Sequence, residues 1–221
     1  MQGLAPGIIQ FSSRRYATLD PLRHSPNVTT AGGAGDNLTG SNLSSAAGVG
    51  IATIGKSSGK WYWETLVNSS TSDNYGKVGI TNVLMVPGSN VPVGLGAGGT
   101  AGQGTVGYFG TFSPVIARYN LIGRVPQIAF VAGTGGMIIN GDVLSTALDC
   151  AASEIKFYRN GTLACTVALT PVGSTWYPAF ASTSAPTSVT FNFGQNAWSP
   201  NSAVGSTRNA LFAAGYNQGL Y

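Results

Sequence analysis

The run of residues 60–67, KWYWETLV, constrains the fold of this chain more than any other segment. Successive side chains of an extended strand point to opposite faces, so Trp61 and Trp63 share one face. Tyr62 and Glu64 lie on the opposite face. Two large indole rings on one face can anchor the core of a β-sandwich. The run therefore predicts a central strand of an all-β domain.

Further runs of β-branched and aromatic residues predict strands along the chain, most clearly in its last third. These runs are residues 49–54, 77–80, 142–149, 154–158, 163–167, 176–180 and 188–194. Between two of them, Asn160-Gly161 predicts a two-residue hairpin turn, because both positions need a positive φ that Asn and Gly adopt readily. Only residues 209–214 are expected to form a helical turn.

The composition favours β-structure as well. Charged residues make up 8% of the chain, against about 25% in an ordinary soluble protein, and glycine occurs 32 times. Long exposed helices need Glu, Lys, Ala and Leu, whereas turn-rich β-structure tolerates Ser, Thr, Asn and Gly. A length of 221 residues suits one large sandwich or barrel and does not require two domains.

The charge pattern disfavours several classes of partner. The net charge is +4, and no stripe of Lys and Arg interleaves with aromatic residues, so we expect no nucleic-acid partner. Residues 1–11 lack the basic start and apolar run of a signal peptide. No stretch of about 18 apolar residues occurs, so we expect no membrane span.

Cys150 and Cys165 are the two cysteines of the chain. A small disulfide scaffold would be far richer in cysteine, so we expect two buried thiols in a reducing cytoplasm. A disulfide between neighbouring strands is the alternative.

Two glycine-rich motifs match nucleotide-binding patterns only formally. Residues 50–57, GIATIGKS, fit the P-loop pattern, and residues 94–99 fit GxGxxG. Both patterns need a helix whose N-terminus binds phosphate, and neither segment is followed by one in our prediction. Ile51 to Ile54 of the first motif form a β-branched run, which is typical of a strand. We expect no nucleotide cofactor.

Catalytic and metal-binding arrangements are also disfavoured. His24 is the one histidine and lies in a polar segment beside a proline, so a catalytic triad would have to use it. Two cysteines fifteen positions apart and one histidine do not build a familiar zinc site. The seven carboxylates are scattered, although Asp149 and Glu154 could approach across a turn. We therefore expect no catalytic residue, metal or cofactor.

Several motifs, taken in order, resemble those of the SPRY domain family. The opening of such a domain is similar to residues 59–64, GKWYWE, and 78–80, VGI. Its most recognisable hairpin is similar to residues 141–149 and 155–161, and its closing strands resemble residues 177–179, YPA, and 189–195, VTFNFGQ. The resemblance implies a two-sheet antiparallel β-sandwich of concanavalin-like jelly-roll topology that serves as a binding or scaffolding module.

The edges of the chain resemble SPRY proteins encoded by tailed bacteriophages, on residues 17–21, ATLDP, and 215–221, GYNQGLY. The expected organisation is an N-terminal arm of residues 1–15, a SPRY sandwich of residues 16–198, and a segment of residues 199–221 that packs on the domain or on neighbours. Residues 120–139 do not align with the family pattern.

Family binding surfaces are loops at one edge of the sandwich. The candidates here are aromatic and arginine residues that we expect on loops, which suit contact hot spots. These residues are Tyr75, Tyr108, Phe109, Arg118 and Tyr119. The alternative is that they fold back onto the sandwich.

The function that we expect is that of a non-enzymatic structural component of a tailed bacteriophage virion, located in the particle and made in the host cytoplasm. It would decorate the capsid or attach to the tail through contacts with other virion proteins, copies of itself included. The alternative is a receptor-binding module that recognises a host-surface glycan or protein.

Overall fold

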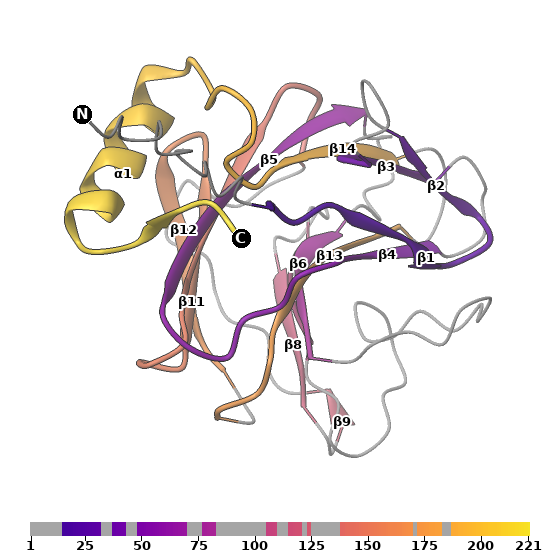
Figure 1. The fold of residues 1–221 in the computed structure, drawn as a ribbon, viewed down its shortest axis with the longest axis horizontal. Coiled ribbons are helices and arrows are strands. Elements are labelled where there is room, and N and C mark those ends of the chain that lie inside the picture. The colour runs from indigo at the N-terminus through magenta and orange to yellow at the C-terminus, as the bar shows by residue number, and fades with distance from the viewer. Residues whose placement is uncertain are drawn as a thin grey trace, which may run out of the picture.

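A computed structural model describes residues 15–31, 37–42, 48–69, 77–82, 105–109, 115–120, 123–124, 138–169, 172–182 and 187–221. Side chains are described throughout these ranges except at Lys77, Ser182 and residues 105–124. In this part of the chain two β-sheets face each other, and one helix lies outside them (Figure 1).

The first sheet has seven strands. They are, in spatial order, β1 (Leu19–His24), β4 (Gly48–Ala52), β13 (Tyr177–Ser182), β6 (Lys77–Thr81), β7 (Thr105–Phe109), β8 (Val115–Asn120) and β9 (Gly123–Arg124).

The second sheet has eight strands. Seven follow each other as β12 (Thr162–Ala168), β11 (Glu154–Arg159), β10 (Val143–Asp149), β5 (Lys60–Ser69), β14 (Thr187–Asn192), β3 (Thr39–Asn42) and β2 (Val28–Ala31). The eighth, β15 (Asn217–Gln218), runs parallel to β5, whereas all the other pairings are antiparallel. The predicted two-sheet antiparallel β-sandwich is confirmed.

The KWYWETLV run forms β5, at the centre of the second sheet, as predicted. It pairs with β10 along one edge and with β14 along the other. Trp63 is completely buried on the inner face, in the core between the sheets. The outer face of β5 is not left to solvent either, because Tyr62 and Glu64 are buried there.

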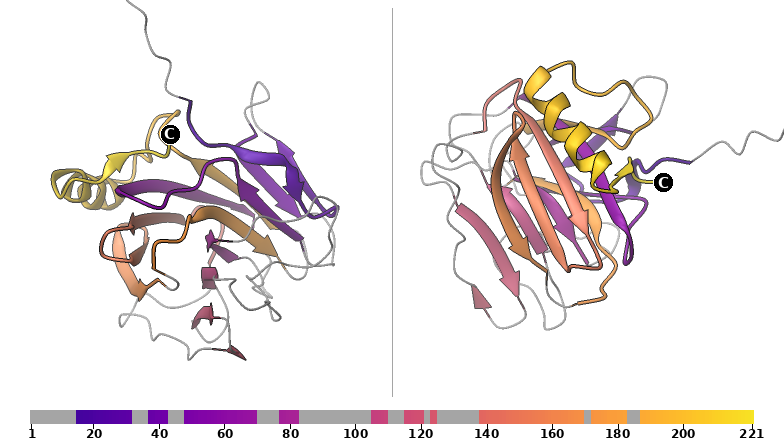
Figure 2. Two further views of the ribbon diagram at one scale, coloured as in Figure 1. Left: turned by 60° about the horizontal axis from the view of Figure 1, so that its bottom comes forward. Right: turned by 90° about the vertical axis from the view of Figure 1, so that its left-hand side faces the viewer.

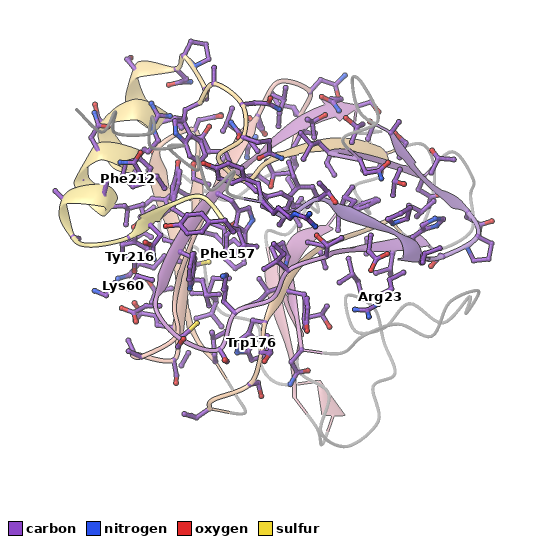
Figure 3. All side chains as sticks on the ribbon, viewed as in Figure 1. Arg23, Lys60, Phe157, Trp176, Phe212 and Tyr216 are labelled. Atoms are coloured by element: carbon purple, nitrogen blue, oxygen red, sulfur yellow. The ribbon has the colours of Figure 1, made fainter. Side chains whose placement is uncertain are left out.

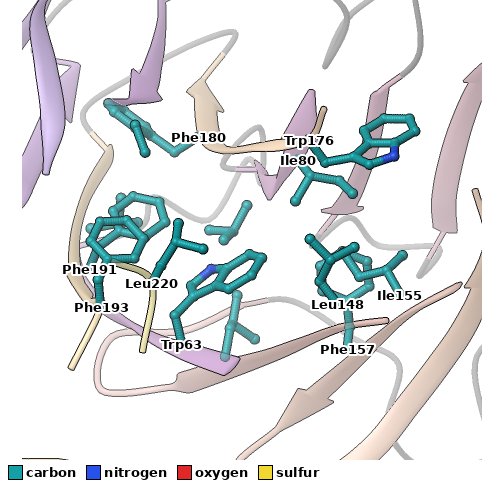
Figure 4. Close-up of a cluster of buried hydrophobic side chains, with 14 of the residues drawn as sticks. Trp63, Ile80, Leu148, Ile155, Phe157, Trp176, Phe180, Phe191, Phe193 and Leu220 are labelled. Atoms are coloured by element: carbon teal, nitrogen blue, oxygen red, sulfur yellow. The ribbon is translucent and has the colours of Figure 1, made fainter. Parts of the chain in front are cut away.

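Aliphatic side chains and aromatic rings from both sheets form the core (Figure 4). Phe191 and Phe193 stack with ring centroids 5.2 Å apart, and Phe180 from the facing sheet lies 6.5 Å from Phe191. Burying a side chain of this size stabilises a fold by about 1.5–3 kcal/mol. Leu220, near the end of the sequence, belongs to the same core and is completely buried.

The P-loop-like motif is a strand and a turn, as expected. Its first glycine, Gly50, lies in β4, and a Cβ there would collide with the ring of Phe180. The same ring lies against Gly40 of β3. Gly50 is therefore a packing position that admits an aromatic ring into the core.

The hairpin turn at Asn160-Gly161 is also as predicted, with φ of 49° and 85°. Gly161 has a second constraint, because a Cβ there would collide with the backbone of Ala203 at the start of the helix α1 (Ser202–Ala213). The hairpin therefore also packs closely against the first residues of that helix.

The prediction of a helical turn at residues 209–214 was too short, since α1 spans twelve residues. Its sequence, SAVGSTRNALFA, contains glycine, serine, threonine and asparagine, which are weak helix formers. Local helix propensity therefore does not predict the full length of the helix. Asn201 caps it: the side-chain oxygen accepts hydrogen bonds from the backbone N–H groups of Ala203 and Val204. None of the described helices is long and apolar enough to cross a membrane.

Candidate functional site

Four of the five residues proposed from the sequence lie in described strands. Tyr108 and Phe109 belong to β7, and Arg118 and Tyr119 belong to the neighbouring β8, so the expected loop positions are wrong for these four. Aromatic and β-branched residues favour strand pairing, which accounts for the difference. The side chains of these four residues, and the whole of Tyr75, lie outside the described part, and their role in binding stays a prediction.

The helix α1 covers the outer face of the second sheet and is held there by a buried polar cluster (Figure 2). Arg208 of α1 donates to Glu64 Oε1 at 2.8 Å, and the other oxygen of Glu64 accepts the backbone N–H of Ser199 at 2.9 Å. The hydroxyl of Tyr62 donates to Glu64 at 2.8 Å and contacts Ser145 at 3.0 Å. Burial raises the pKa of Tyr62, and the charge of Glu64 adds to that rise.

This cluster fixes the position of Trp198. The indole lies 5.6 Å from the ring of Tyr62 and 6.1 Å from that of Phe212, and Arg208 lies 5.8 Å from it. Phe212 itself meets Tyr62 edge to face at 5.4 Å. Trp198 is therefore held on three sides while part of its ring remains at the surface.

A glycine ends α1 and turns the chain back along β5. Gly215 has φ of 87°, its N–H donates to Phe212, and the next N–H, of Tyr216, donates to Leu211. This is a Schellman motif, which needs the left-handed conformation that glycine adopts without strain. The chain then forms β15, where the side chain of Asn217 donates to the backbone oxygen of Lys60 at 2.9 Å.

A surface groove of about 470 Å³ opens where these elements meet. Three tyrosines, one tryptophan, two amide side chains and one glycine form its walls. They are Tyr16, Gly194, Trp198, Tyr216, Asn217, Gln218 and Tyr221. We call this set of residues the aromatic groove; it is formed by residues just before β1 and by residues 194–221.

The rings of the aromatic groove hold one another in place. Tyr221 meets Tyr16 edge to face at 5.9 Å and meets Trp61 at 5.6 Å. Edge-to-face pairs of this kind are favoured by the quadrupoles of the two rings. Each ring therefore has a defined orientation without a bound ligand.

Two lysines border the groove, and both are already engaged. Lys56 Nζ lies 3.9 Å from the ring centroid of Trp61 and donates to the backbone oxygen of Tyr221, and burial lowers its pKa. Lys60 lies beside Tyr216, below α1, with its Nζ 5.4 Å from that ring, and it pairs with Asp149 at 3.4 Å (Figure 3). Among the described groove residues, the lining itself carries no charged side chain.

A second, more apolar groove of about 270 Å³ lies on the outer face of the second sheet and shares Trp198 with the first. Its walls come from β5, β10, β14 and the segment 196–200, and Leu66, 42% exposed, is part of it.

The two candidate carboxylates, Asp149 and Glu154, already have hydrogen-bond or ion-pair partners. They are opposite each other in the register of β10 and β11, but Asp149 accepts hydrogen bonds from the backbone N–H groups of Ala151 and Ala152. Glu154 pairs with Lys156 at 2.8 Å. In the described ranges, no group of three or more His, Cys, Asp or Glu side chains is placed to hold a metal ion.

The two cysteines are free thiols rather than a disulfide. Burial raises the pKa of Cys165 to about 12 and that of Cys150 to about 11. A thiol with a raised pKa is a poor nucleophile at neutral pH, because the thiolate is the reactive form.

No family model matches the sequence, and no curated protein matches it. Solved structures match the fold. The SPRY domain of human HERC1 has a TM-score of 0.57 at 18% identity, and the alignment covers 81% of this chain and 99% of that one. The PSpry domain of TRIM65 has a TM-score of 0.54 at 14% identity, covering 80% and 90%.

Stonustoxin has a TM-score of 0.52 at 18% identity, and the alignment covers 80% of this chain and 27% of the toxin. At such identities the likeness establishes the fold: this chain is a β-sandwich of the SPRY type. The expectation drawn from the sequence motifs is confirmed at that level.

Sequence reasoning did not single out the aromatic groove. The sequence placed residues 215–221, GYNQGLY, in a phage-like ending that was expected to pack on the domain or on neighbours, and it gave no signal for Tyr16 or Trp198. The tertiary fold brought this ending together with Tyr16 and Trp198.

Proposed function

We propose that this chain is a non-enzymatic binding module of a tailed bacteriophage virion, which decorates the capsid or attaches to the tail through contacts with other virion proteins. The observation that carries the proposal is the aromatic groove. Four of its seven lining residues lie within residues 215–221, and a fifth, Tyr16, directly precedes residues 17–21; these are the two segments on which the phage resemblance rests. The backbone N–H of Ala17 donates a hydrogen bond to the carbonyl oxygen of Leu220, which joins the two segments.

Tyrosine and tryptophan are the side chains that most often dominate protein contacts, because they bury a large area at a small entropy cost. The groove collects four of them on a rigid base, and α1 fixes one of its walls through Arg208 and Glu64. The exposed backbone and small polar groups of a Gly- and Ser-rich surface add contacts around it. Capsid or tail proteins, and further copies of this chain, are the proposed partners.

Cross-linking of intact particles, followed by mass spectrometry, tests this function. We expect cross-links from Lys60, at the rim of the groove, to the major capsid protein or to a tail protein. Cross-links to the capsid protein would support a position on the capsid, and cross-links to tail proteins would support a position on the tail. Absence of the protein from purified particles would overturn the proposal.

A receptor-binding module that recognises a host-surface glycan or protein is the second candidate. It is favoured by the amide groups of Asn217 and Gln218, which lie beside the rings at the groove. The purified, fluorescently labelled chain should then label host cells, and Trp198→Ala should reduce the labelling. No labelling at micromolar concentration would count against this function.

A further inference from the structure

The groove that shares Trp198 with the aromatic groove is apolar, and we call it the apolar groove. Its apolar walls come from Leu66, Val143, Ala197, Trp198 and Pro200. Leu66 is 42% exposed although β5 is a central strand of its sheet. The volume of about 270 Å³ is below the range of about 300–1,000 Å³ that is usual for small-molecule sites. The groove therefore suits one or two side chains of a polypeptide.

The polar side chains of the apolar groove already have partners within the chain. Glu64 accepts a hydrogen bond from Arg208, and Thr190 Oγ1 accepts one from Asn68 at 2.8 Å. Asn192 donates to two backbone oxygens of the loop that follows β14. A polar ligand would have to replace these hydrogen bonds, whereas an apolar side chain is simply removed from water. The groove therefore selects an apolar occupant.

The described chain begins beside a wall of this groove. Gln195 Nε2 donates to the backbone oxygen of Ala17 at 3.4 Å, and the next residue, Asn196, lines the apolar groove. Arg15, two positions before Ala17, is exposed. Residues 1–14 lie outside the described part of the chain, and they are joined to it next to the groove.

Those residues include side chains of the kind that the groove selects. Their sequence, MQGLAPGIIQFSSR, contains a cluster of Ile8, Ile9 and Phe11. Ile9 and Phe11 share one face of an extended segment. An extended chain spans at most about 3.6 Å per residue, so Phe11, four positions before Arg15, can lie about 14 Å from it. Ile9 is six positions before Arg15 and can lie about 22 Å away, so both can enter a groove that begins beside the attachment point.

The short connection favours the arm of the same chain over a separate partner. A segment joined through a short linker has an effective concentration on the order of millimolar at the site beside it. A second copy of the chain, at micromolar concentration in solution, competes poorly with such a segment. The occupant that these observations favour is therefore intramolecular.

We propose that Ile9 and Phe11 of the N-terminal arm occupy the apolar groove of their own chain and cover Leu66. Docking removes the apolar side chains of the arm and of the groove from water together, which is the source of its stability. The aromatic groove carries the proposed virion contacts, whereas this inference concerns the second groove. The two proposals are therefore independent.

Limited proteolysis of the purified full chain tests the docked arm. Trypsin cleaves after Arg14 and Arg15, and it has to bind several residues on each side of the cleaved bond. A docked arm is therefore cleaved only in the fraction of molecules in which it has left the groove. We expect the double variant Ile9→Ser with Phe11→Ser to lose the arm about tenfold faster, as for an arm docked in about nine molecules of ten. Mass spectrometry of the released peptide measures the rate.

Matched variants separate docking from a general effect of substitution. Gln10→Ser changes the residue between the two anchors and should leave the cleavage rate unchanged. Leu66→Ser, on the groove side, should accelerate cleavage as the double variant does. Leu22→Ser removes a leucine that is 74% exposed on β1 of the other sheet, and it should have no effect. Thermal unfolding checks that the sandwich of each variant is folded.

Photo-cross-linking identifies the surface that the arm contacts. A p-benzoylphenylalanine in place of Phe11 keeps a large aromatic side chain at that position. After irradiation, mass spectrometry maps the residues to which it has coupled. We expect cross-links within the monomer to Leu66, Val143 or residues 196–200.

Three results would overturn the proposal. They are equal cleavage rates for the double variant and the unmodified chain, cross-links spread over the whole surface, and cross-links formed mainly between two chains. The last result would mean that the arm of a second copy occupies the groove. The presence or absence of the protein in virus particles affects neither measurement, so failure of the virion role and failure of the docked arm are distinguishable.

Discussion

The backbone N–H of Ala17 donates a hydrogen bond of 2.8 Å to the carbonyl oxygen of Leu220, so the two end segments of the described chain are joined directly. Leu220 donates in turn to Phe193, and its side chain is buried in the core beneath. The side chain of Gln195 also reaches Ala17 O, at 3.4 Å. Residues on both sides of this junction, Tyr16 and Tyr221, form walls of the aromatic groove. The hydrogen bonds and the buried side chain of Leu220 therefore hold both of these walls on the sandwich core.

Removal of Arg208 should destabilise the protein strongly. Arg208→Leu leaves the carboxylate of Glu64, 4% exposed, buried without its cation, and we expect a loss of about 3 kcal/mol in the free energy of unfolding. The corresponding fall in Tm is about 6–12 °C for a chain of this length. Urea and thermal unfolding measure both quantities.

Arg23→Leu is the matched control, because Arg23 pairs with Asp20 at the surface and should cost less than about 0.5 kcal/mol. The double variant Glu64→Leu with Arg208→Leu should regain much of the lost stability, since no buried charge is left unpaired. Equal effects of Arg208→Leu and Arg23→Leu would show that the buried pair does not hold α1.

The stability of the protein should fall in alkaline solution through Cys165. Burial raises the pKa of this thiol from 9.0 to about 12, so the folded state retains a proton that the unfolded state loses. The stabilisation is fully present below pH 9 and is lost as the pH rises toward 12, by about 1.4 kcal/mol per pH unit for this group. Unfolding by urea at a series of pH values measures this slope.

Cys165→Ala should give a correspondingly shallower decline above pH 9. Cys150 and Tyr62, whose pKa values are also raised, still contribute in that variant. Parallel curves for the variant and the unmodified chain would exclude Cys165 as a source of the alkaline loss.

Gly50→Ala should destabilise the sandwich, and it should not change nucleotide binding. The added Cβ meets the ring of Phe180, and overpacking of a core usually costs about 1–3 kcal/mol. Chemical unfolding measures the loss, and calorimetry with ATP should show no binding by either protein. An unchanged stability, or ATP binding that the substitution removes, would contradict the packing role of Gly50.

Gly205→Ala should have the opposite effect on stability. Gly205 lies within α1, and a Cβ there meets only the end of the Arg208 side chain, at 3.4 Å. Alanine is a better helix former than glycine by about 1 kcal/mol, so the free energy of unfolding should rise by about 0.5–1 kcal/mol. A decrease would indicate that Arg208 cannot adjust without loosening Glu64.

Local sequence predicted the strands β4 to β6 and β10 to β14, but not β1 to β3, β7 to β9 or β15. Alternation in residues 60–67 defines β5 because successive side chains of any strand point to opposite faces, and Asn160-Gly161 defines a turn because its φ values favour those two residues. The order of the motifs was enough to predict a SPRY-type sandwich. These features need only neighbours in the sequence.

Tertiary structure alone decided the groove and the helix beside it. The α1 sequence has weak helical propensity, and the helix is supported by Asn201, by the burial of Val204 and Leu211, and by Arg208 against Glu64. Sequence alternation placed Glu64 on the outer face of β5 but gave no sign that a helix would cover it. The groove joins Tyr16 to residues 194–221, and no local pattern encodes such proximity, because it results from the closure of the two sheets around a shared core.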